Sequence, residues 1–202
     1  MLNQLNSTCK IPLSDVRTIA ITGHSRGLGK YLSESLCIHH KVINVSSRID
    51  EDLDQLLEEV HGADVFINNA HSEYAQVDLF LRLFELWKLD DKKLIINIGS
   101  RSAEPNISKG YAYSAAKSAL MHAVKSVVFT SPDKRCRVTL LNLGLLNSDL
   151  PSLDYATVKE VIDFVLACKT DVEIPILYLQ NSEPYAAVQS AKAFRKSVNS
   201  TW

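Results

Sequence analysis

Three residues in the second half of the chain have the types and spacing that acid–base chemistry on a carbonyl needs. Tyr113 and Lys117 are four residues apart in the segment Tyr-Ser-Ala-Ala-Lys, and Ser100 precedes the tyrosine by 13 residues. A phenol has an ordinary pKa near 10 and ionises at neutral pH only when a cation lies close. Residues i and i+4 share one face of a helix, so Lys117 would stabilise the Tyr113 phenolate.

Carbonyl reduction needs a proton donor to the forming alkoxide and a second hydrogen bond to the same oxygen. Tyr113 would be the donor and Ser100 the second partner. Each residue alone has a plainer interpretation, because a tyrosine and a lysine at this spacing also occur on solvated helix faces, and a serine after a strand is often a turn residue. The spacing of all three together favours chemistry.

A glycine cluster near the N-terminus predicts a nucleotide turn. Only 7 of the 202 residues are glycine, and Gly23, Gly27 and Gly29 fall within seven positions. Glycines let the backbone take unusual angles and let a diphosphate approach the amides that begin a helix. The spacing is G-x-x-x-G-x-G rather than the usual G-x-G-x-x-G, so a purely structural turn is the alternative.

The elements that must position these residues alternate along the chain. Short apolar runs predict strands at 17–22, 41–45, 64–68, 93–98, 137–143 and 173–179, and amphipathic patterns predict helices at 26–38, 50–61, 73–89, 110–130 and 155–168. This alternation predicts an α/β fold with a doubly wound parallel sheet of about six strands in three layers. We expect one domain over 1–202, with a core of 15–180, an arm at 1–14 and a tail at 184–202. Pro175 predicts that the last strand lies at an edge.

The motifs, in this order, resemble those of the short-chain dehydrogenase/reductase family. The match covers roughly 17–180 and consists of Thr22 to Gly29, the Asp-Val-Phe-Ile-Asn-Asn-Ala segment at 64–70, the strand ending in Ser100, the Tyr113/Lys117 pair and Leu143-Gly144. The resemblance implies a Rossmann-like fold, a nicotinamide dinucleotide and hydride transfer between an alcohol and a ketone or aldehyde. It assigns catalysis to Ser100, Tyr113 and Lys117.

The resemblance also assigns the residues that contact the cofactor. Tyr113 and Lys117 would meet the nicotinamide ribose, and the other contacts would come from three loops: Gly23, His24, Ser25, Arg26, Gly27, Leu28 and Gly29; Asn69, Ala70 and His71; and Gly144, Leu145 and Ser148. Family members carry a relay asparagine whose nearest counterpart here is Asp78. Asp78 is either that relay or an ordinary first-turn helix aspartate.

The residues after the second predicted strand bear on the choice of dinucleotide. Ser46, Ser47 and Arg48 follow it without an acid, and the glycine turn adds Arg26. Two arginines and two hydroxyls suit a 2′-phosphate, so we predict NADP(H), with NAD as the alternative. Ordinary surface arginines are the plainer interpretation. By the resemblance, Asp50 would contact the adenine amino group.

The chain departs from the family pattern at several points. Only residues 49–63 separate the ribose-reading position from the Asn-Asn-Ala motif, so we expect one strand fewer than in full-length members. The segment 145–153 is short where the family has a longer lid. His71 replaces a glycine, and Leu143 replaces a proline. His71 is either a tolerated substitution or a contact to the nicotinamide or the substrate.

The composition excludes some classes of protein. Lysine plus arginine number 22 and aspartate plus glutamate 23, a net charge of −1 that argues against nucleic-acid or membrane-surface binding. No apolar run reaches the roughly 18 residues of a membrane span, and no secretory signal is evident. The four widely spaced cysteines predict mostly buried, reduced thiols, and the histidines predict no metal site. We expect a cytoplasmic protein with a small-molecule substrate.

Two functional hypotheses follow. The first is an NADP(H)-dependent oxidoreductase, and the second is a catalytically weak or inactive nucleotide-binding regulatory or scaffold protein of the same fold. The apolar residues of 73–89 and 110–130 further predict a homodimer or homotetramer, because family members commonly pair these two helices. They are Phe80, Leu83, Leu86, Trp87, Val124, Val127 and Val128.

Overall fold

The computed structural model describes residues 16–104, 110–148 and 151–182. The expected arm at 1–14 and tail at 184–202 lie outside the described residues. Within them, six parallel strands form one sheet in the order β2-β1-β3-β4-β5-β6. The strands are β1 (Thr18–Ile21), β2 (Lys41–Asn44), β3 (Val65–Asn68), β4 (Leu94–Ser100), β5 (Arg137–Leu143) and β6 (Ile176–Leu179).

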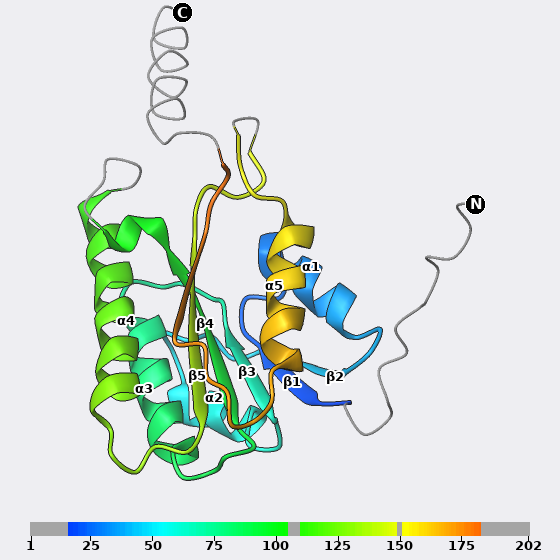
Figure 1. Ribbon diagram of the computed structural model, residues 1–202, viewed down its shortest axis with the longest axis vertical. Helices are drawn as coiled ribbons and strands as arrows, with labels where there is room; N and C mark the ends of the chain where they lie inside the picture. The colour runs from blue at the N-terminus through cyan, green and yellow to red at the C-terminus, as the bar shows by residue number, and fades with distance from the viewer. Residues whose placement is uncertain (1–15, 105–109, 149–150, 183–202) are drawn as a thin grey trace, which may run out of the picture.

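Helices cover both faces of this sheet (Figure 1). The helices are α1 (Gly27–Leu36), α2 (Leu53–Glu59), α3 (Ala75–Trp87), α4 (Tyr111–Thr130) and α5 (Tyr155–Ala167), and a short 3₁₀ helix η2 (Arg101–Ala103) follows β4. α2, α3 and α4 lie on one face, and α1 and α5 lie on the other. The predicted class, a doubly wound parallel α/β sheet in three layers, is confirmed.

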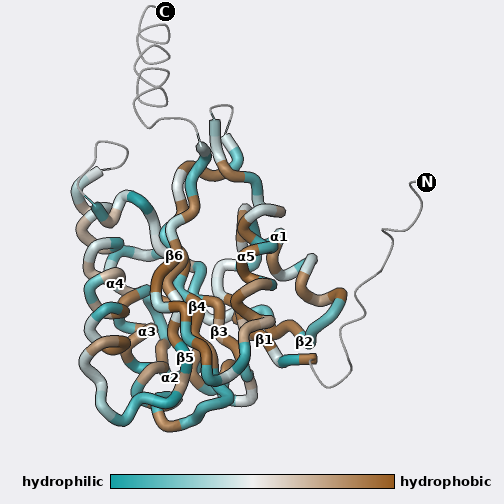
Figure 2. The backbone as a smooth tube through the Cα atoms, viewed as in Figure 1, coloured by the Kyte–Doolittle hydropathy of each residue, from teal (hydrophilic) through white to brown (hydrophobic). Residues whose placement is uncertain are grey.

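The apolar core explains why the strands read as continuous apolar runs. Ala20 and Phe66 point into the layer of α2, α3 and α4, whereas Ile19, Ile21 and Ile67 point into the layer of α1 and α5. Because both faces are covered, alternate residues are equally apolar. Figure 2, in which the backbone is coloured by residue hydropathy, shows hydrophobic residues concentrated in the strands of the sheet.

The sheet has the shortened connection that the sequence predicts. Only α2 separates β2 from β3, and β2 is therefore one edge of the sheet. β6 is the opposite edge, as predicted from Pro175, which lies just before the strand and accepts a hydrogen bond from the Leu140 amide at 2.9 Å. A proline lacks the amide donor that a central strand needs on both sides.

Most of the apolar residues that suggested a subunit interface belong to the core. Five of them are buried between the sheet and its helices: Phe80, Leu83, Trp87, Val124 and Val127. Leu86 remains 66% exposed, and Phe129, a further apolar residue of α4, remains 68% exposed. Core packing thus accounts for most of the apolar residues that the sequence shows on these two helices, and Leu86 and Phe129 are among those left exposed for a contact between subunits.

The described cysteines are free thiols that differ in exposure. Cys136 is buried and Cys168 half-buried, but Cys37 is exposed, so the expected burial does not hold for Cys37 because it lies just past the buried face of α1. Cys9 lies outside the described residues. Within the described part of the chain, no helix has the length and apolarity to cross a membrane.

Candidate active site

The glycine turn is a closely packed link between β1 and α1. Gly23 and Gly27 have φ values of +69° and +57°, in the left-handed region that side chains rarely adopt. A Cβ on Gly29 would lie 2.1 Å from the Gly23 carbonyl oxygen. Leu28 and Gly29 are buried beneath the turn, and Ser25 and Arg26 are exposed on it. Glycine is therefore required here by backbone geometry.

The turn after β3 is hydrogen-bonded to the glycine turn. The amides of Asn69 and Ala70 both donate to the Thr22 hydroxyl at 3.0 Å, and the Asn69 side chain donates to the Thr22 carbonyl at 3.0 Å. The predicted cofactor residues Gly23, Asn69 and Ala70 are thus brought together. Here the Asn69 side chain holds the glycine turn.

The residues present fit a dinucleotide diphosphate. The first amides of a helix have no partner within the helix, and no side chain caps the start of α1 at Arg26. The Nδ1 atom of His24, in the turn itself, is buried without a hydrogen-bond partner. Amides at a helix N-terminus suit an anion, and an imidazole nitrogen beside them can donate a further hydrogen bond when it carries the proton.

Ser100 and the tyrosine helix lie at the same edge of the sheet. Ser100 ends β4, and its hydroxyl accepts the Ser102 amide at 3.1 Å, which caps η2. η2 is tied to α4 because the Ser118 hydroxyl donates to the Ala103 carbonyl. The carboxyl end of the strands, where ligands bind in α/β sheets, therefore carries Ser100 next to the helix that begins at Tyr111.

His71, Tyr113 and Lys117 meet at this edge. The Lys117 ammonium lies 5.7 Å from the centre of the Tyr113 ring, as expected for residues one turn apart. The His71 ring meets the Tyr113 ring edge-on, with centres 4.8 Å apart. Burial and the nearby Lys117 charge lower the pKa of His71. His71 therefore touches a predicted catalytic residue and is mostly neutral at pH 7.

Lys117 is held by uncharged groups. Its side chain is 4% exposed, and the ammonium donates to the Gln76 Oε1 atom at 2.6 Å and to the Ile98 carbonyl at 3.0 Å. Burial lowers the pKa of Lys117 to about 8. The lysine therefore stays largely protonated at neutral pH, beneath the tyrosine whose phenolate it would stabilise.

Gln76 joins this lysine to a buried amide network. Its Nε2 atom donates to the carbonyls of Asn68 and Ile98, at 2.8 and 3.1 Å. The Asn68 side chain in turn donates to the Gln76 carbonyl at 3.0 Å and to the Asn97 Oδ1 atom at 2.9 Å. Every link is buried. These contacts orient the Gln76 amide so that its oxygen faces the Lys117 ammonium.

The sequence offered Asp78 either as the counterpart of the relay residue or as an ordinary first-turn aspartate, and the structure places Gln76 on the lysine instead. Asp78 is exposed on the outer face of α3. Gln76 shares the buried face with Phe80, Leu83 and Trp87. The signal that identifies Gln76 is its helical phase, because a glutamine in register with a buried apolar stripe needs a polar partner inside the protein.

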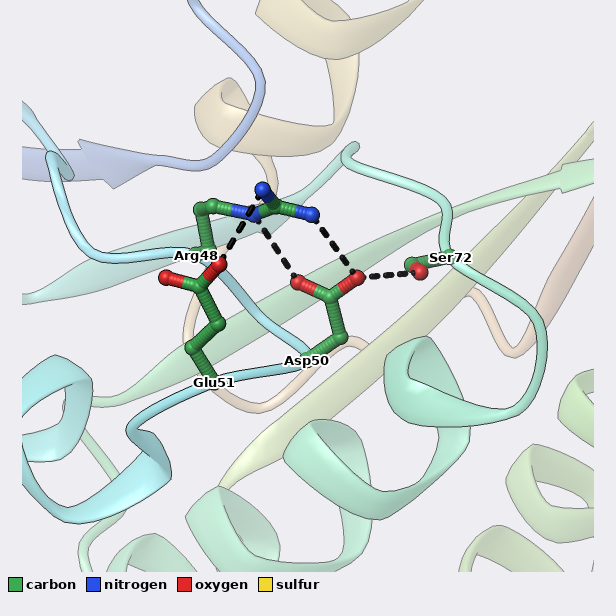
Figure 3. A network of polar contacts seen from close by, with 4 residues as sticks. All are labelled: Arg48, Asp50, Glu51 and Ser72. Carbon is green, nitrogen blue, oxygen red and sulfur yellow. Dashed lines mark hydrogen bonds and ion pairs between the residues drawn. The ribbon is translucent and has the colours of Figure 1, made fainter.

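One of the two arginines predicted to hold a 2′-phosphate, Arg48, is paired with carboxylates. The Arg48 guanidinium contacts Asp50 at 3.2 and 3.3 Å and Glu51 at 3.0 Å, and Asp50 accepts the Ser72 hydroxyl at 2.7 Å (Figure 3). The hydrogen bonds from Ser72 and then Arg48 lower the pKa of Asp50. Arg48, with 66% of its side chain exposed, therefore lies at the surface and is already paired with two carboxylates.

Glu59 occupies the end of β2, a contact that the sequence did not reveal. Its carboxylate accepts the amides of Ser46 and Ser47 at 2.8 and 3.1 Å, and both serine hydroxyls also donate to it. Burial opposes ionisation, but the hydrogen bonds from Ser47 and Ser46 outweigh it and lower the pKa of Glu59. An acid is therefore present where the local sequence shows none.

The segment after β5 lies at the same edge as the glycine turn. Gly144 donates its amide to the Leu179 carbonyl at 2.7 Å, and Ser148 donates its amide to the Ser152 hydroxyl at 3.0 Å. Gly144 and Leu145 are half-buried, and Ser148 is exposed. Residues 149–150 of the short predicted lid lie outside the described residues. Across residues 16–104, 110–148 and 151–182, no three histidine, cysteine or acidic side chains gather as metal ligands.

Solved structures of dehydrogenases and reductases share this architecture. A 3-ketoacyl-(acyl-carrier-protein) reductase from Brucella melitensis complexed with NADH is 16% identical, with a TM-score of 0.66 over 82% of this chain and 97% of the other. An alcohol dehydrogenase from Thermococcus sibiricus complexed with 5-hydroxy-NADP is 19% identical, with a TM-score of 0.64 over 84% and 99%. A short-chain dehydrogenase from Streptomyces avermitilis is 18% identical, with a TM-score of 0.60 over 95% and 96%.

No family model matches the sequence, and no curated protein matches it. The structural likenesses, all below 20% identity, show the fold. The chain therefore has the fold of short-chain dehydrogenases/reductases, as the motifs suggested, with a six-stranded sheet. One fold supports many activities, so the activity depends on the residues of the site.

Proposed function

We propose that this protein is a nicotinamide-dinucleotide-dependent oxidoreductase that interconverts an alcohol and a ketone or aldehyde. The observation that carries the proposal is the buried Lys117 ammonium 5.7 Å from the Tyr113 ring, at the sheet edge that also carries the glycine turn. Burying a cation costs free energy even when it is hydrogen-bonded, and buried titratable groups with shifted pKa values are typical of active sites.

The chain's own residues supply the acid–base part of this reaction. When bound, the dinucleotide supplies or accepts the hydride. In reduction, the Tyr113 phenol donates its proton to the carbonyl oxygen, and the Ser100 hydroxyl donates a second hydrogen bond to that oxygen. Lys117 stabilises the phenolate that remains, and Gln76 and the Ile98 carbonyl hold the ammonium in place.

The second candidate function is a dinucleotide-binding regulatory or scaffold protein without turnover. The contact between His71 and Tyr113 is the observation that favours it, because an imidazole against the phenol ring reduces the room at the predicted nicotinamide side. Both candidates use the glycine turn, and only the oxidoreductase uses Tyr113 as an acid. Binding and turnover must therefore be measured separately.

The choice between NADP(H) and NAD(H) belongs to the proposal. The NADP(H) preference predicted from the sequence rests on Arg26 and Arg48. Arg48 is paired with Asp50 and Glu51, so Arg26, exposed on the glycine turn, is the arginine that supports this preference. The proposed function needs a nicotinamide dinucleotide and holds with either one.

A homodimer or homotetramer in the cytoplasm completes the proposal. Leu86 and Phe129 remain exposed on α3 and α4, the helices that the family resemblance implicates in pairing. We expect the wild type to form a dimer or a larger species in light scattering at micromolar concentration. The double variant Leu86→Glu/Phe129→Glu should be monomeric under the same conditions. A wild type that is already monomeric would contradict this part of the proposal.

The experiment for the proposed function combines binding with turnover. Calorimetry measures the affinity for NADH and NADPH, and absorbance measures the consumption of each with a panel of ketones and aldehydes. Binding together with turnover that Ser100→Ala strongly reduces supports the oxidoreductase. Binding without turnover by the wild type supports the regulatory candidate. Failure to bind either dinucleotide contradicts both candidates.

A further inference from the structure

We infer that Glu59 determines which dinucleotide binds, and that it selects an adenosine ribose with a free 2′-hydroxyl, as in NAD(H), over one with a 2′-phosphate. This inference rests on the proposed function and reverses the preference predicted from the sequence. It is carried by the geometry of Ser46 and Ser47, which were predicted to bind the phosphate together with Arg26 and Arg48.

The position of these serines places them at the ribose end of the site. The pairing between β1 and β2 continues to the Val45 amide, which donates to the Ile21 carbonyl at 3.0 Å. Ser46 and Ser47 therefore leave the sheet beside Thr22 and Gly23, where the glycine turn begins. In doubly wound folds, the end of the second strand reads the ribose of a dinucleotide bound at the first turn.

Glu59 uses the hydrogen-bond donors of Ser46 and Ser47 and leaves acceptors at this position. Both serine hydroxyl protons and both serine amides point at its carboxylate. A phosphate can only accept hydrogen bonds, and these four donors are already used. The serine oxygens keep lone pairs that accept. A ribose 2′-hydroxyl can donate to such an oxygen, so the position suits a hydroxyl and offers a phosphate no donor.

The charges around this position act in the same direction. Its hydrogen bonds lower the pKa of Glu59, so the carboxylate is ionised at neutral pH. Arg48, the nearest predicted phosphate ligand, is shared between Asp50 and Glu51. Counting Arg26 of the glycine turn with Arg48, the predicted phosphate position has two positive charges against the three negative charges of Asp50, Glu51 and Glu59. A doubly charged phosphate would meet a net negative surface.

The shortened connection explains why the acid comes from an unexpected place. α2 is only seven residues long, and Glu59 is its last residue. With no strand between β2 and β3, the end of this helix reaches back to the end of β2. Glu59 follows Ser47 by 12 residues, so inspection of the residues directly after β2 does not identify it.

The test compares the affinities of wild type and Glu59→Gln for NADH and NADPH by calorimetry. We expect the wild type to bind NADH at least tenfold more tightly than NADPH. Glu59→Gln should bind NADPH about tenfold more tightly than the wild type does, with NADH affinity changed less than threefold. The matched control is Glu58→Gln, an exposed neighbour that should leave both affinities unchanged.

Each other outcome has a definite meaning. Tighter NADPH binding by the wild type overturns the inference and leaves the proposed function standing, and this result does not depend on whether any variant folds. An unchanged ratio in a folded Glu59→Gln also overturns it, because Glu59 would then only cap the end of β2. If neither dinucleotide binds, the proposed function itself fails. Asp50→Asn, which releases Arg48 from one carboxylate, provides a second variant that should bind NADPH more tightly.

Discussion

The two ends of the candidate site hold their charges in opposite ways. At the catalytic end, the Lys117 side chain is 4% exposed and is held by an amide oxygen and a backbone carbonyl. At the ribose end, the Arg48 side chain is 66% exposed and is held by two carboxylates. Buried contacts fix single atoms and are costly to break, whereas exposed ion pairs are screened by water and salt. We therefore expect substitutions at the catalytic end to reduce stability, and substitutions at the ribose end to change recognition.

The largest effect is expected in the glycine turn, on which both ends depend. Gly29→Ala would place a Cβ 2.1 Å from the Gly23 oxygen and 2.5 Å from the Asn69 side chain. We expect the free energy of unfolding to fall by about 3 kcal/mol, as for severe overpacking, and NADH affinity to fall at least a hundredfold. Denaturant titration and calorimetry measure the two effects. Gly62→Ala is the control, because a Cβ there meets no atom within 4 Å. Equal behaviour of the two variants would contradict the close packing of the turn.

The next effect is the pH dependence that Lys117 gives to stability. Its pKa is lowered by burial from 10.5 to about 8. Between these values the unfolded chain binds a proton that the folded chain does not, so stability should rise as the pH increases through this range. One group contributes at most about 1.4 kcal/mol per pH unit. Lys117→Met should remove this contribution, and denaturant titrations of both proteins at several pH values should show it in their difference. Parallel curves would contradict a buried ammonium.

A smaller loss is expected from the lysine's acceptor. Gln76→Leu removes the hydrogen bond to the buried ammonium and two amide hydrogen bonds to backbone carbonyls, and we expect the free energy of unfolding to fall by about 2 kcal/mol. In assays that follow oxidation of NADH or NADPH, we expect activity to fall off at a lower pH than in the wild type. The reason is that Lys117 loses its proton more easily when the Gln76 oxygen no longer stabilises the ammonium. Asp78→Asn, an exposed change on the same helix, should leave both properties unchanged. The opposite pattern would restore Asp78 as the residue that serves the lysine.

The smallest effect on stability is expected at the ribose end. Arg48→Ala removes contacts that are exposed to solvent, so the midpoint of thermal unfolding should shift by less than about 2 °C. Calorimetric scans at low and high salt measure this shift. A decrease of many degrees would mean that the ribose end is as tightly built as the catalytic end, and the comparison between them would fail.

The fold was predictable because it depends on features that are local in the sequence. Continuous apolar runs mark strands covered on both faces, the short span before the Asn-Asn-Ala motif indicates a missing strand, and Pro175 indicates an edge. The placement of Tyr113 and Lys117 follows from helical spacing alone. The expected strands and helices agree with the structure within a few residues at their ends.

The details of the site depend on contacts between elements, which local spacing does not encode. Gln76 meets Lys117 across 41 residues, and Asp50 meets Ser72 across 22 residues. The contact between Glu59 and Ser47 depends on where the short helix α2 ends. The burial of Gln76 could have been inferred from its helical phase. The pairing of Arg48 and the position of Glu59 require the three-dimensional structure.

The most direct test of the proposed oxidoreductase is the Tyr113→Phe variant, which removes the acid and keeps the ring that contacts His71. The rate of NADH or NADPH consumption with a carbonyl substrate is compared with the affinity of the same variant for that dinucleotide. We predict a rate at least about a thousandfold lower, in the range of a lost general acid, with an affinity within threefold of wild type. A rate within a few-fold of wild type would contradict the catalytic role of Tyr113 and the account built on it.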